Sequence, residues 1–469
     1  MSKILTISAC AIILIIFSLL LISGISGCAN NEFSLTPQEK TGKVIGENGA
    51  TEVGTGWSAN ENPEEAVNEA IAMALENKKI KNPDFVIVFA TSGSNMSAIL
   101  NELRKELGNV KIYGGTSASR AVMTDKGLLN AENKEYSPQN MAGKKGLTIM
   151  TISSKEIIFG VGSANLKSYD SAQKASNAAI LEAIKSAGKS QNELPQIILV
   201  TPTRLIEEEI LEGIEDVVGK NTIILGGTAG GPPRGVFGNN EVYEEGVSLA
   251  AIYTDLPIGW VFEGGFDVND LHSGIVTKAA DQEIIEIDNR PALEVYNEWL
   301  EGEIVKLSEK FTEERPIRDF LTLHPLYRKF QSENGQIYFL FSHPWPKDFT
   351  FKEKSIMTST KIKVGEKVYL SHGTWEILLN RVGNLPKTAK ANGGFDINDK
   401  PILGIGYVCN GVFGAIPEIE RGKMPILINY ANNNAPFIAP FTSGEQGHFP
   451  GVGNKHGNLL TSFLVIGRG

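Results

Sequence analysis

Two stretches of the chain decide the fold, because they repeat each other at one constant offset, from Pro83 to Pro195. The first is Pro83-Asp84-Phe85-Val86-Ile87-Val88-Phe89-Ala90-Thr91, and the second is Pro195-Gln196-Ile197-Ile198-Leu199-Val200-Thr201-Pro202-Thr203. Each is a short apolar run with a polar end, which is typical of a buried strand. A second pair matches at the same offset without a gap, Asn109 to Gly114-Gly115-Thr116 and Asn221 to Gly226-Gly227-Thr228. The pattern therefore indicates an internal duplication.

The segments around these strands have helical periodicity. Ser94 or Asn95 can cap a helix whose buried stripe is Met96, Ile99, Leu100, Leu103 and Leu107. An Ala-rich helix is predicted before each pair of strands, over 63–75 and 171–187. Residues 44–266 are therefore predicted to be two copies of one α/β unit.

The pattern changes after residue 266. Strand-like runs recur at 337–341, 361–370 and 402–409, and Pro291 fits the first turn of a helix. We therefore expect an α+β domain over 267–469. The predicted fold class is α/β for the duplicated part, followed by this α+β domain.

The composition bounds the function. The chain has 469 residues, of which 42% are hydrophobic and 21% are charged, so it is globular and is neither disordered nor a coiled coil. The net charge is −10 and no long basic cluster occurs, which disfavours nucleic acid as a partner. No loop matches a P-loop or a dinucleotide fingerprint, so nucleotide binding is not supported and no cofactor is expected.

The N-terminus reads as an export signal. Lys3 is followed by an apolar run to Ile22 and by Ile25-Ser26-Gly27-Cys28, which resembles the lipobox of prokaryotic lipoproteins, although Leu is more usual than Ile at its first position. That resemblance implies that residues 1–28 are a signal peptide and lipobox, and that Cys28 becomes a lipidated N-terminus. The polar stretch 29–43 is then a flexible tether.

An uncleaved membrane anchor is the alternative, because the apolar run of about 19 residues is long enough to span a bilayer. Both interpretations place the rest of the chain in the cell envelope, outside the cytoplasm and tethered to a membrane. Of the three cysteines, only Cys409 lies beyond the lipobox, so the folded part has no internal disulfide.

The order of several short motifs resembles the FIST family, with its N-terminal and C-terminal segments. The first segment is matched by Gly56-Trp57-Ser58, the strand Phe85 to Phe89 and the turn Gly114-Gly115-Thr116-Ser117. The second is matched by Ile284 to Tyr296, by Val408-Cys409 and by Ser443-Gly444-Glu445. The resemblance covers about 55 to 465. One departure is Asn410-Gly411-Val412, where the family often has a small residue and Arg.

The resemblance implies a sensory module for small ligands, with amino acids proposed. It assigns 44–266 to a FIST N-type domain and 267–469 to a FIST C-type domain. Some relatives are similar to haem-based nitric-oxide sensors, so a haem or nitric-oxide sensor is one alternative. The chain has no room for a signalling output domain, which implies a separate signalling protein as partner. We expect a binding protein rather than an enzyme, with its small polar ligand, an amino acid or another carboxylate, between the domains.

The candidate ligand-binding residues follow the predicted strands, since ligands of α/β folds bind at the carboxyl ends of strands. These loops offer hydroxyls, bare backbone N–H groups and arginines that can hold a carboxylate. Each residue can equally serve an ordinary turn or helix cap. The set is Ser92, Ser94, Thr116, Ser117, Arg120, Thr203, Arg204 and Arg234, with Cys409 and Glu445 from the C-terminal half.

The cysteine, glutamate and histidine side chains give weaker indications of catalysis or metal binding. Cys409 could be a nucleophile and Glu445 an acid or base, so a hydrolase is a second alternative, but the apolar run around Cys409 favours a buried, inert thiol. All six histidines lie after residue 271, and no metal-ligand spacing occurs, so no metal site is predicted. His448 and His456, which flank the loop after Glu445, form the best cluster. Trp57 and Trp260 are interpreted as core or sheet-edge aromatics.

Overall fold

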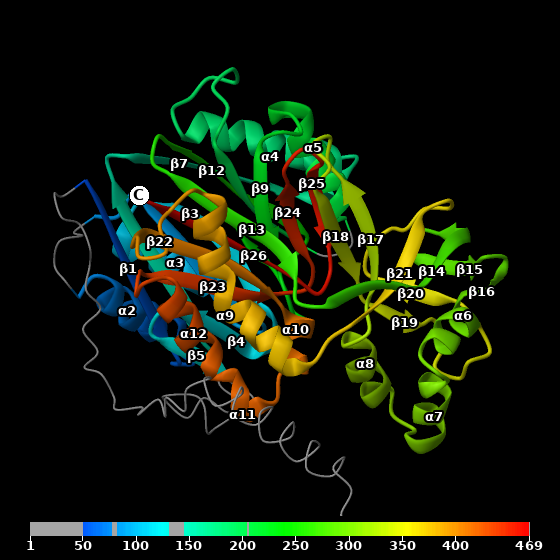
Figure 1. Cartoon of the computed structure of the whole chain (residues 1–469). Coiled ribbons are helices and arrows are strands. Elements are labelled where there is room, and N and C mark those ends of the chain that lie inside the picture. Colours follow the sequence, from blue (N-terminus) through cyan, green and yellow to red (C-terminus); the bar gives the residue numbers. More distant parts are fainter. Residues whose placement is uncertain (1–49, 77–81, 131–144, 204–205, 469) are drawn as a thin grey trace, which may run out of the picture. The chain divides into compact units, whose positions relative to one another are not determined.

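A computed structural model describes residues 50–76, 82–130, 145–203 and 206–468, all within one compact unit (Figure 1). The described residues form three six-stranded sheets and one eight-stranded sheet. The predicted mixed α/β class is confirmed.

The first copy of the α/β unit spans residues 51–154. Its strand β2 is the uninterrupted apolar run of the sequence, and all seven of its residues are buried. Asn95 caps the following helix through its side chain, which accepts the N–H of Ala98. The elements are β1 (Thr51–Ser58), α2 (Pro63–Ala74), β2 (Phe85–Thr91), α3 (Met96–Leu107), β3 (Lys111–Ser117), the hairpin β4 (Ala121–Thr124) and β5 (Gly127–Asn130), and β6 (Leu147–Ser154).

The second copy repeats this order over residues 157–254, as the constant offset between the two stretches predicts. Strands β2 and β3 are parallel, and so are their counterparts β8 and β9. The elements are β7 (Ile157–Asn165), α4 (Ala172–Ser186), β8 (Ile197–Pro202), α5 (Glu207–Val218), β9 (Ile223–Gly227), the hairpin β10 (Val236–Phe237) and β11 (Val242–Tyr243), and β12 (Gly246–Thr254).

The structure adds a third copy, which the sequence analysis missed. Its elements have the same order, with β22 parallel to β23. They are β13 (Ile258–Gly264), α9 (Trp375–Asn392), β22 (Pro401–Cys409), α10 (Asn410–Ala415), α11 (Glu418–Arg421), α12 (Lys423–Ala431), β23 (Phe437–Thr442), the hairpin β24 (Glu445–Phe449) and β25 (Gly453–Gly457), and β26 (Leu460–Gly467). The predicted duplication is therefore a triplication.

An insertion hides the third copy from sequence comparison. Residues 267–372 separate β13 from α9 and form the eight-stranded sheet with three helices, on the right of Figure 1. The predicted boundary at 266/267 thus falls inside the third copy. The elements of the insertion are β14 (Asp267–Ala280), β15 (Glu283–Ile287), β16 (Arg290–Pro291), α6 (Ala292–Trp299), α7 (Glu303–Lys310), α8 (Glu314–Thr322), β17 (Leu326–Gln331), β18 (Ile337–Ser342), β19 (Pro344–Pro346), β20 (Ile356–Thr358) and β21 (Lys367–His372).

A shared close contact between helix and strand supports the three-copy interpretation. A Cβ atom on Gly56 of β1 would lie 1.9 Å from the carbonyl oxygen of Ala70 in α2. Gly162 of β7 makes the same approach to Ala179 in α4, at 2.0 Å, and Gly259 of β13 approaches Ala389 in α9, at 2.1 Å. Only glycine allows backbones to come this close, so each copy uses glycine to seat an Ala-containing helix on its first strand.

The hairpin of each copy pairs with the sheet of another copy. The first sheet has the order β1-β6-β2-β3-β10-β11, the second β7-β12-β8-β9-β24-β25, and the third β13-β26-β22-β23-β4-β5. The hairpin of the second copy thus completes the first sheet, that of the third copy completes the second sheet, and that of the first copy completes the third sheet. This cyclic exchange joins the segments predicted as FIST N-type and C-type into one folded body.

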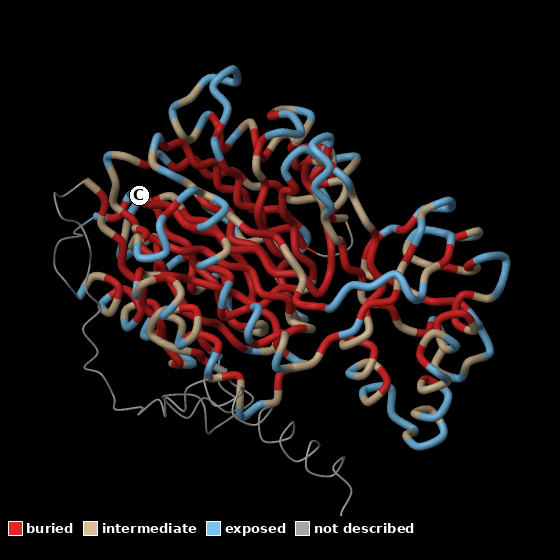
Figure 2. Tube along the Cα trace, viewed as in Figure 1, coloured by how far each residue is buried: buried red, intermediate tan, exposed pale blue. Residues whose placement is uncertain are grey.

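The three sheets share one central core. Its buried side chains come from all three copies, and the red strands in Figure 2 mark this interior. At its centre, the hydroxyl of Tyr113 lies 2.8 Å from that of Thr201 and 2.6 Å from that of Tyr407. One residue from each copy thus meets in a buried hydrogen-bonded group, while separate apolar clusters fill the space between the sheets and their helices.

Candidate functional site

The strand-end loops of the three copies meet one another. The loop after β9 is in contact with the other copies through its backbone. The N–H of Gly230 donates to the carbonyl of Thr116, and the N–H of Thr228 donates to that of Gly444. Gly231 also lies against the side chain of Ser92. The glycine-rich loop is therefore the joint between the copies.

Three of the five predicted hydroxyls form hydrogen bonds to backbone groups, within a copy or between copies. The Oγ1 atoms of Thr116 and Thr203 accept the N–H groups of Gly235 and Gly246, at 3.2 and 3.1 Å. The Oγ of Ser117 donates to the carbonyl of Ala121 and accepts the N–H of Phe441. These contacts satisfy backbone groups of the hairpins and strands, which is the structural role that the turn interpretation of these residues predicts.

The remaining predicted loop residues are placed differently. Ser94 lies 3.3 Å from Thr91 through the two hydroxyls, next to the helix cap. Arg120 is exposed, and Arg234 is half-buried with an interaction of its own. Arg204 and the predicted lipidation site Cys28 lie outside the described residues.

Cys409 and Glu445, predicted independently, are in contact. Both are buried, at 2% and 0% exposure, and burial raises the pKa of the Cys409 thiol well above its ordinary value, with the Glu445 charge adding to the shift. Burial also raises the pKa of Glu445 to about 8, although Thr442 donates a 2.8 Å hydrogen bond to its Oε1. The pair is therefore neutral at pH 7, and the thiol lacks the thiolate character that a nucleophile requires.

The position of Cys409 explains its burial. In the first copy, Thr91 accepts the N–H of Gly146 through Oγ1 at the end of β2, and in the second copy Thr203 plays the same part for Gly246. Cys409 ends β22, the corresponding strand, where burial raises its pKa and the backbone N–H of Leu459 offsets a small part of that rise. The thiol therefore occupies a structural position that the other copies fill with threonine.

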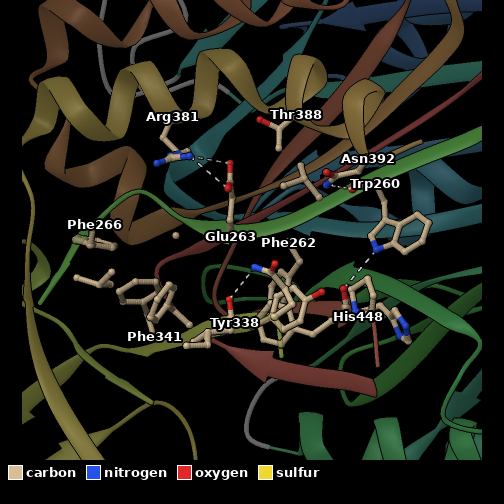
Figure 3. Close-up of a pocket in the computed structure, with 18 of the residues that line it drawn as sticks. Trp260, Phe262, Glu263, Phe266, Tyr338, Phe341, Arg381, Thr388, Asn392 and His448 are labelled. Atoms are coloured by element: carbon tan, nitrogen blue, oxygen red, sulfur yellow. Dashed lines mark hydrogen bonds and ion pairs between the residues drawn. The ribbon is translucent and has the colours of Figure 1, made fainter. Parts of the chain in front are cut away.

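A cavity of about 660 Å³ lies beside the third copy and is a candidate binding site. One wall is β13 with α9, the opposite wall is β18 of the insertion, and the end of β24 closes one side (Figure 3). The polar lining residues are Glu263, Asn334, Gln336, Arg381, Thr388, Asn392 and His448. The aromatic ones are Trp260, Phe262, Phe266, Tyr338, Phe339, Phe341 and Phe449.

An ion pair marks the polar side of the cavity. The Nη1 atom of Arg381 on α9 lies 3.3 Å from the nearer carboxylate oxygen of Glu263 on β13. Their side chains are 44% and 24% exposed, so both reach solvent. Burial raises the pKa of Glu263, whereas the Arg381 charge and hydrogen bond lower it. One cation and one anion thus stand side by side at the cavity wall (Figure 3).

The opposite side of the cavity is aromatic. Phe449 stacks on Tyr338 with ring centroids 4.8 Å apart and also contacts Phe262 at 5.1 Å. Burial raises the pKa of Tyr338. The indole Nε1 of Trp260 donates to the carbonyl of His448 at 3.3 Å, which ties β13 to the end of β24. The aromatic rings supply rigid apolar surface on which a ligand side chain can pack.

The sequence predicts no site at this cavity, although two of its lining residues are named there for other reasons. Trp260, interpreted as a core or sheet-edge aromatic, lies on β13, which is the edge strand of the third sheet. His448 was grouped with His456, and both lie on the hairpin β24–β25. Trp57 is a core aromatic as predicted, at 6% exposure. Glu263 and Arg381 are 118 residues apart, so no local pattern could have brought them together.

Comparison with known proteins identifies one domain of the chain. Residues 84–290 match the model of the FIST N domain, as the motif order predicted. FIST domains form a family of sensory and ligand-binding modules. The matched segment covers the first copy from β2 onward, all of the second copy, β13 of the third copy and the start of the insertion.

Solved structures give weaker matches. A crystal structure of a cyanuric acid hydrolase from A. caulinodans is 8% identical and covers 90% of this chain and 99% of that chain, with a TM-score of 0.36. A second cyanuric acid hydrolase structure is 9% identical and covers 90% of this chain and 100% of that chain, with a TM-score of 0.30. No curated protein matches the sequence. Among the helices of the described ranges, none is both long and apolar enough to cross a membrane.

Proposed function

We propose that this protein senses a small zwitterionic ligand of the amino-acid class, bound in the cavity between the third copy and the insertion. The Glu263–Arg381 pair beside an aromatic wall carries the proposal. The α-carboxylate of an amino acid would pair with Arg381, its ammonium group with Glu263, and its side chain would pack on the aromatic rings.

The energetics of the pair favour exchange for a ligand. An ion pair whose members are 44% and 24% exposed contributes only about 0 to 1 kcal/mol to stability, so a ligand loses little by separating the two charges. Each charge then meets a ligand group inside a cavity that excludes part of the water, where the new pairs are stronger. The separated pair therefore acts as a preformed receptor for one positive and one negative group.

The position of the cavity suits a sensor. Its two walls belong to different substructures, the third copy and the insertion, so a bound ligand contacts both. A ligand that binds better when the walls are close shifts the population toward that arrangement. A separate signalling protein would read that shift, since FIST modules are sensory.

We also propose that the protein works outside the cytoplasm, anchored to a membrane through Cys28. The support is the sequence over 1–28, with its apolar run and lipobox-like Ile25-Ser26-Gly27-Cys28. Labelled palmitate should enter the wild-type protein during growth and should be lost with Cys28→Ala. Equal labelling of both proteins, or recovery of the wild type in the soluble cytosol with its first Met intact, would contradict this part.

Ligand binding is tested by thermal shift and calorimetry with the soluble chain from residue 44 onward. At least one of the twenty amino acids should raise the melting temperature in a concentration-dependent way, because a ligand of the native state stabilises it by mass action. Arg381→Ala and Glu263→Gln should each weaken that ligand by about 1.5 to 3 kcal/mol, or tenfold to a hundredfold.

Arg290→Ala is the matched control. Arg290 forms an exposed pair with Glu298 in the insertion, outside the cavity lining, so its loss removes the same chemistry without touching the site. The control should bind the ligand as the wild type does. A flat response to all amino acids and small carboxylates, or an affinity that Arg290→Ala lowers as much as Arg381→Ala does, would overturn the proposal.

A further inference from the structure

The hairpins of the second and third copies occupy equivalent places on the sheets that they complete. In the first sheet, Val236 of the borrowed hairpin pairs with Gly115. In the second sheet, Glu445 pairs with Gly227, which is the counterpart of Gly115 in the repeated Gly-Gly-Thr. One residue further on, the cross-strand pair Gln446 and His456 therefore corresponds to Phe237 and Val242.

The side chains at these equivalent places are apolar in the first sheet and polar in the second. Phe237 and Val242 pack with Met96, the first residue of α3, in an apolar cluster. The offset that relates the first two copies places Glu208, in the first turn of α5, where Met96 stands in the first copy. The second interface thus replaces three apolar side chains by an amide, an imidazole and a carboxylate.

The third interface follows the apolar pattern. Met123 and Leu128, paired across β4 and β5, hold the corresponding position on the third sheet. Both belong to the apolar cluster of that sheet, with at most 2% exposure. Two of the three interfaces between a hairpin and the sheet that it completes are therefore apolar. The polar interface at the second sheet, called the polar joint below, is not required by the architecture.

The polar joint brings three metal-ligating side chains together. Glu207, Glu208 and His456 each offer one ligand atom, and these atoms all lie within 4.8 Å of one another. Bonds of about 2.1 Å to one metal ion hold neighbouring ligand atoms about 3 to 4 Å apart. Closure around an ion thus requires only a small movement of side chains.

An unpartnered carboxylate oxygen at this interface points to a missing ligand. Glu207 is 2% exposed, and its Oε1 accepts the hydroxyl of Thr228 at 3.1 Å, but its Oε2 has no hydrogen-bond partner among the described residues. Gln446 is 1% exposed, and within the described part of the chain its Oε1 is unpartnered as well. A buried carboxylate oxygen without a partner is costly, and a bound cation removes that cost.

The amide of Gln446 is placed to orient the imidazole. Its Nε2 lies 3.1 Å from Nδ1 of His456. In the present orientation, Nε2 of Gln446 also donates to the Thr228 hydroxyl, which in turn donates to Glu207. Half a turn of the amide places its oxygen beside Nδ1–H of His456 and beside the Thr228 hydroxyl, which then donates to Gln446 and releases the Glu207 carboxylate. The other ring nitrogen is then the free lone-pair donor, which is the arrangement that metal-binding histidines use.

We propose that Glu207, Glu208 and His456 bind one divalent transition-metal ion at the joint between the second sheet and the hairpin of the third copy. One imidazole and two carboxylates suit Zn²⁺, Mn²⁺, Co²⁺ or Fe²⁺ better than Ca²⁺ or Mg²⁺, which take oxygen ligands. The N-terminus of α5 by itself favours acidic side chains, but it does not call for the imidazole or leave oxygens unpartnered. This inference departs from the sequence-based expectation of no metal.

The test uses the untagged chain from residue 44 onward, stripped with a chelator and titrated with Zn²⁺ and Co²⁺. Calorimetry should show one saturable site, and Zn²⁺ should raise the melting temperature. Bound Co²⁺ should absorb visible light more strongly than hydrated Co²⁺, because it leaves octahedral coordination. Glu207→Gln and His456→Gln should weaken Zn²⁺ by at least about tenfold, and Gln446→Ala, at a positioning residue, by about tenfold to a hundredfold.

Two variants serve as matched controls. Glu209→Gln changes the next carboxylate of the same helix, which lies 4.0 Å from Lys361. His272→Gln removes an exposed imidazole of the insertion. Both should bind Zn²⁺ within about twofold of the wild type, since neither supplies a ligand atom.

If Glu207→Gln or His456→Gln fails to fold, the half-buried Glu208→Gln and the Co²⁺ spectrum of the wild type still decide the matter. A wild type with no saturable site, a Co²⁺ spectrum equal to that of the hydrated ion, or a Glu208→Gln variant that binds as tightly as Glu209→Gln would overturn the proposal.

Discussion

The first two copies and the third share one order of strands, yet they differ in what they leave open. The first two copies close their strand-end loops with backbone hydrogen bonds, and the hydroxyls of Thr116 and Thr203 are used there. The third copy carries an insertion of residues 267–372, a cavity beside its first strand, and a hairpin with buried polar residues. The three copies of one fold thus differ in their insertion, in the cavity beside the first strand and in the polarity of the hairpin.

The largest expected effect compares the apolar and polar hairpin joints. Phe237→Ala should destabilise the protein by about 3 to 5 kcal/mol, because it leaves a cavity in a fully buried cluster. Gln446→Ala in metal-free protein should cost only about 1 kcal/mol, the worth of its hydrogen bonds. Urea unfolding of both variants in a chelator measures the difference. Equal losses would show that the polar joint is as structural as the apolar one.

The second prediction concerns Glu445, which occupies the place of Val236 and Val122 in the other hairpins. Its pKa in the folded protein is about 8, above the ordinary value of 4.5, so the folded state holds a proton that the unfolded chain releases. Stability is therefore full below about pH 4.5 and falls as the pH rises to about 8, by an amount on the order of 5 kcal/mol.

Glu445→Gln should remove this dependence, because the amide stays neutral at every pH. Melting temperatures measured from pH 4.5 to 9 should fall in the wild type and stay nearly level in the variant, after comparison with Glu209→Gln, a control whose side chain is 44% exposed. Parallel curves for the wild type and Glu445→Gln would mean that this carboxyl is ionised in the fold at pH 7.

The smallest expected effect concerns Cys409. Because Thr91 and Thr203 end the corresponding strands of the other copies, Cys409→Thr should change the free energy of unfolding by less than about 1 kcal/mol. The native wild type should also react slowly with a thiol reagent, since the thiol is buried and its pKa is raised. Fast labelling, or loss of ligand binding in Cys409→Thr, would show that the thiol has a functional role and not only a structural one.

Much of the fold could be predicted from the sequence, because its strands and helices are marked by patterns of neighbouring residues. The strands at 85–91 and 197–202 are uninterrupted apolar runs, and Asn95 is a recognisable cap, so periodicity and capping suffice for the first two copies. The third copy could not be found in this way, because the insertion separates β13 from α9 and its strands lack the Gly-Gly-Thr signature.

The site was harder to predict than the fold. Cys409 and Glu445 were singled out separately, and the structure brings them together, but as a neutral buried pair. Glu263 and Arg381 meet only because the insertion loops out between them, and Glu207 meets His456 only through the exchange of hairpins. Such contacts depend on long-range pairing, which no local residue pattern records.

A crystal structure of the protein with the amino acid that raises its melting temperature most tests the central claim most directly. Our account predicts electron density for that ligand between β13, α9 and β18, with its carboxylate on Arg381 and its ammonium group on Glu263. Density at the strand-end loops of the first two copies instead, beside Thr116 or Thr203, would contradict it.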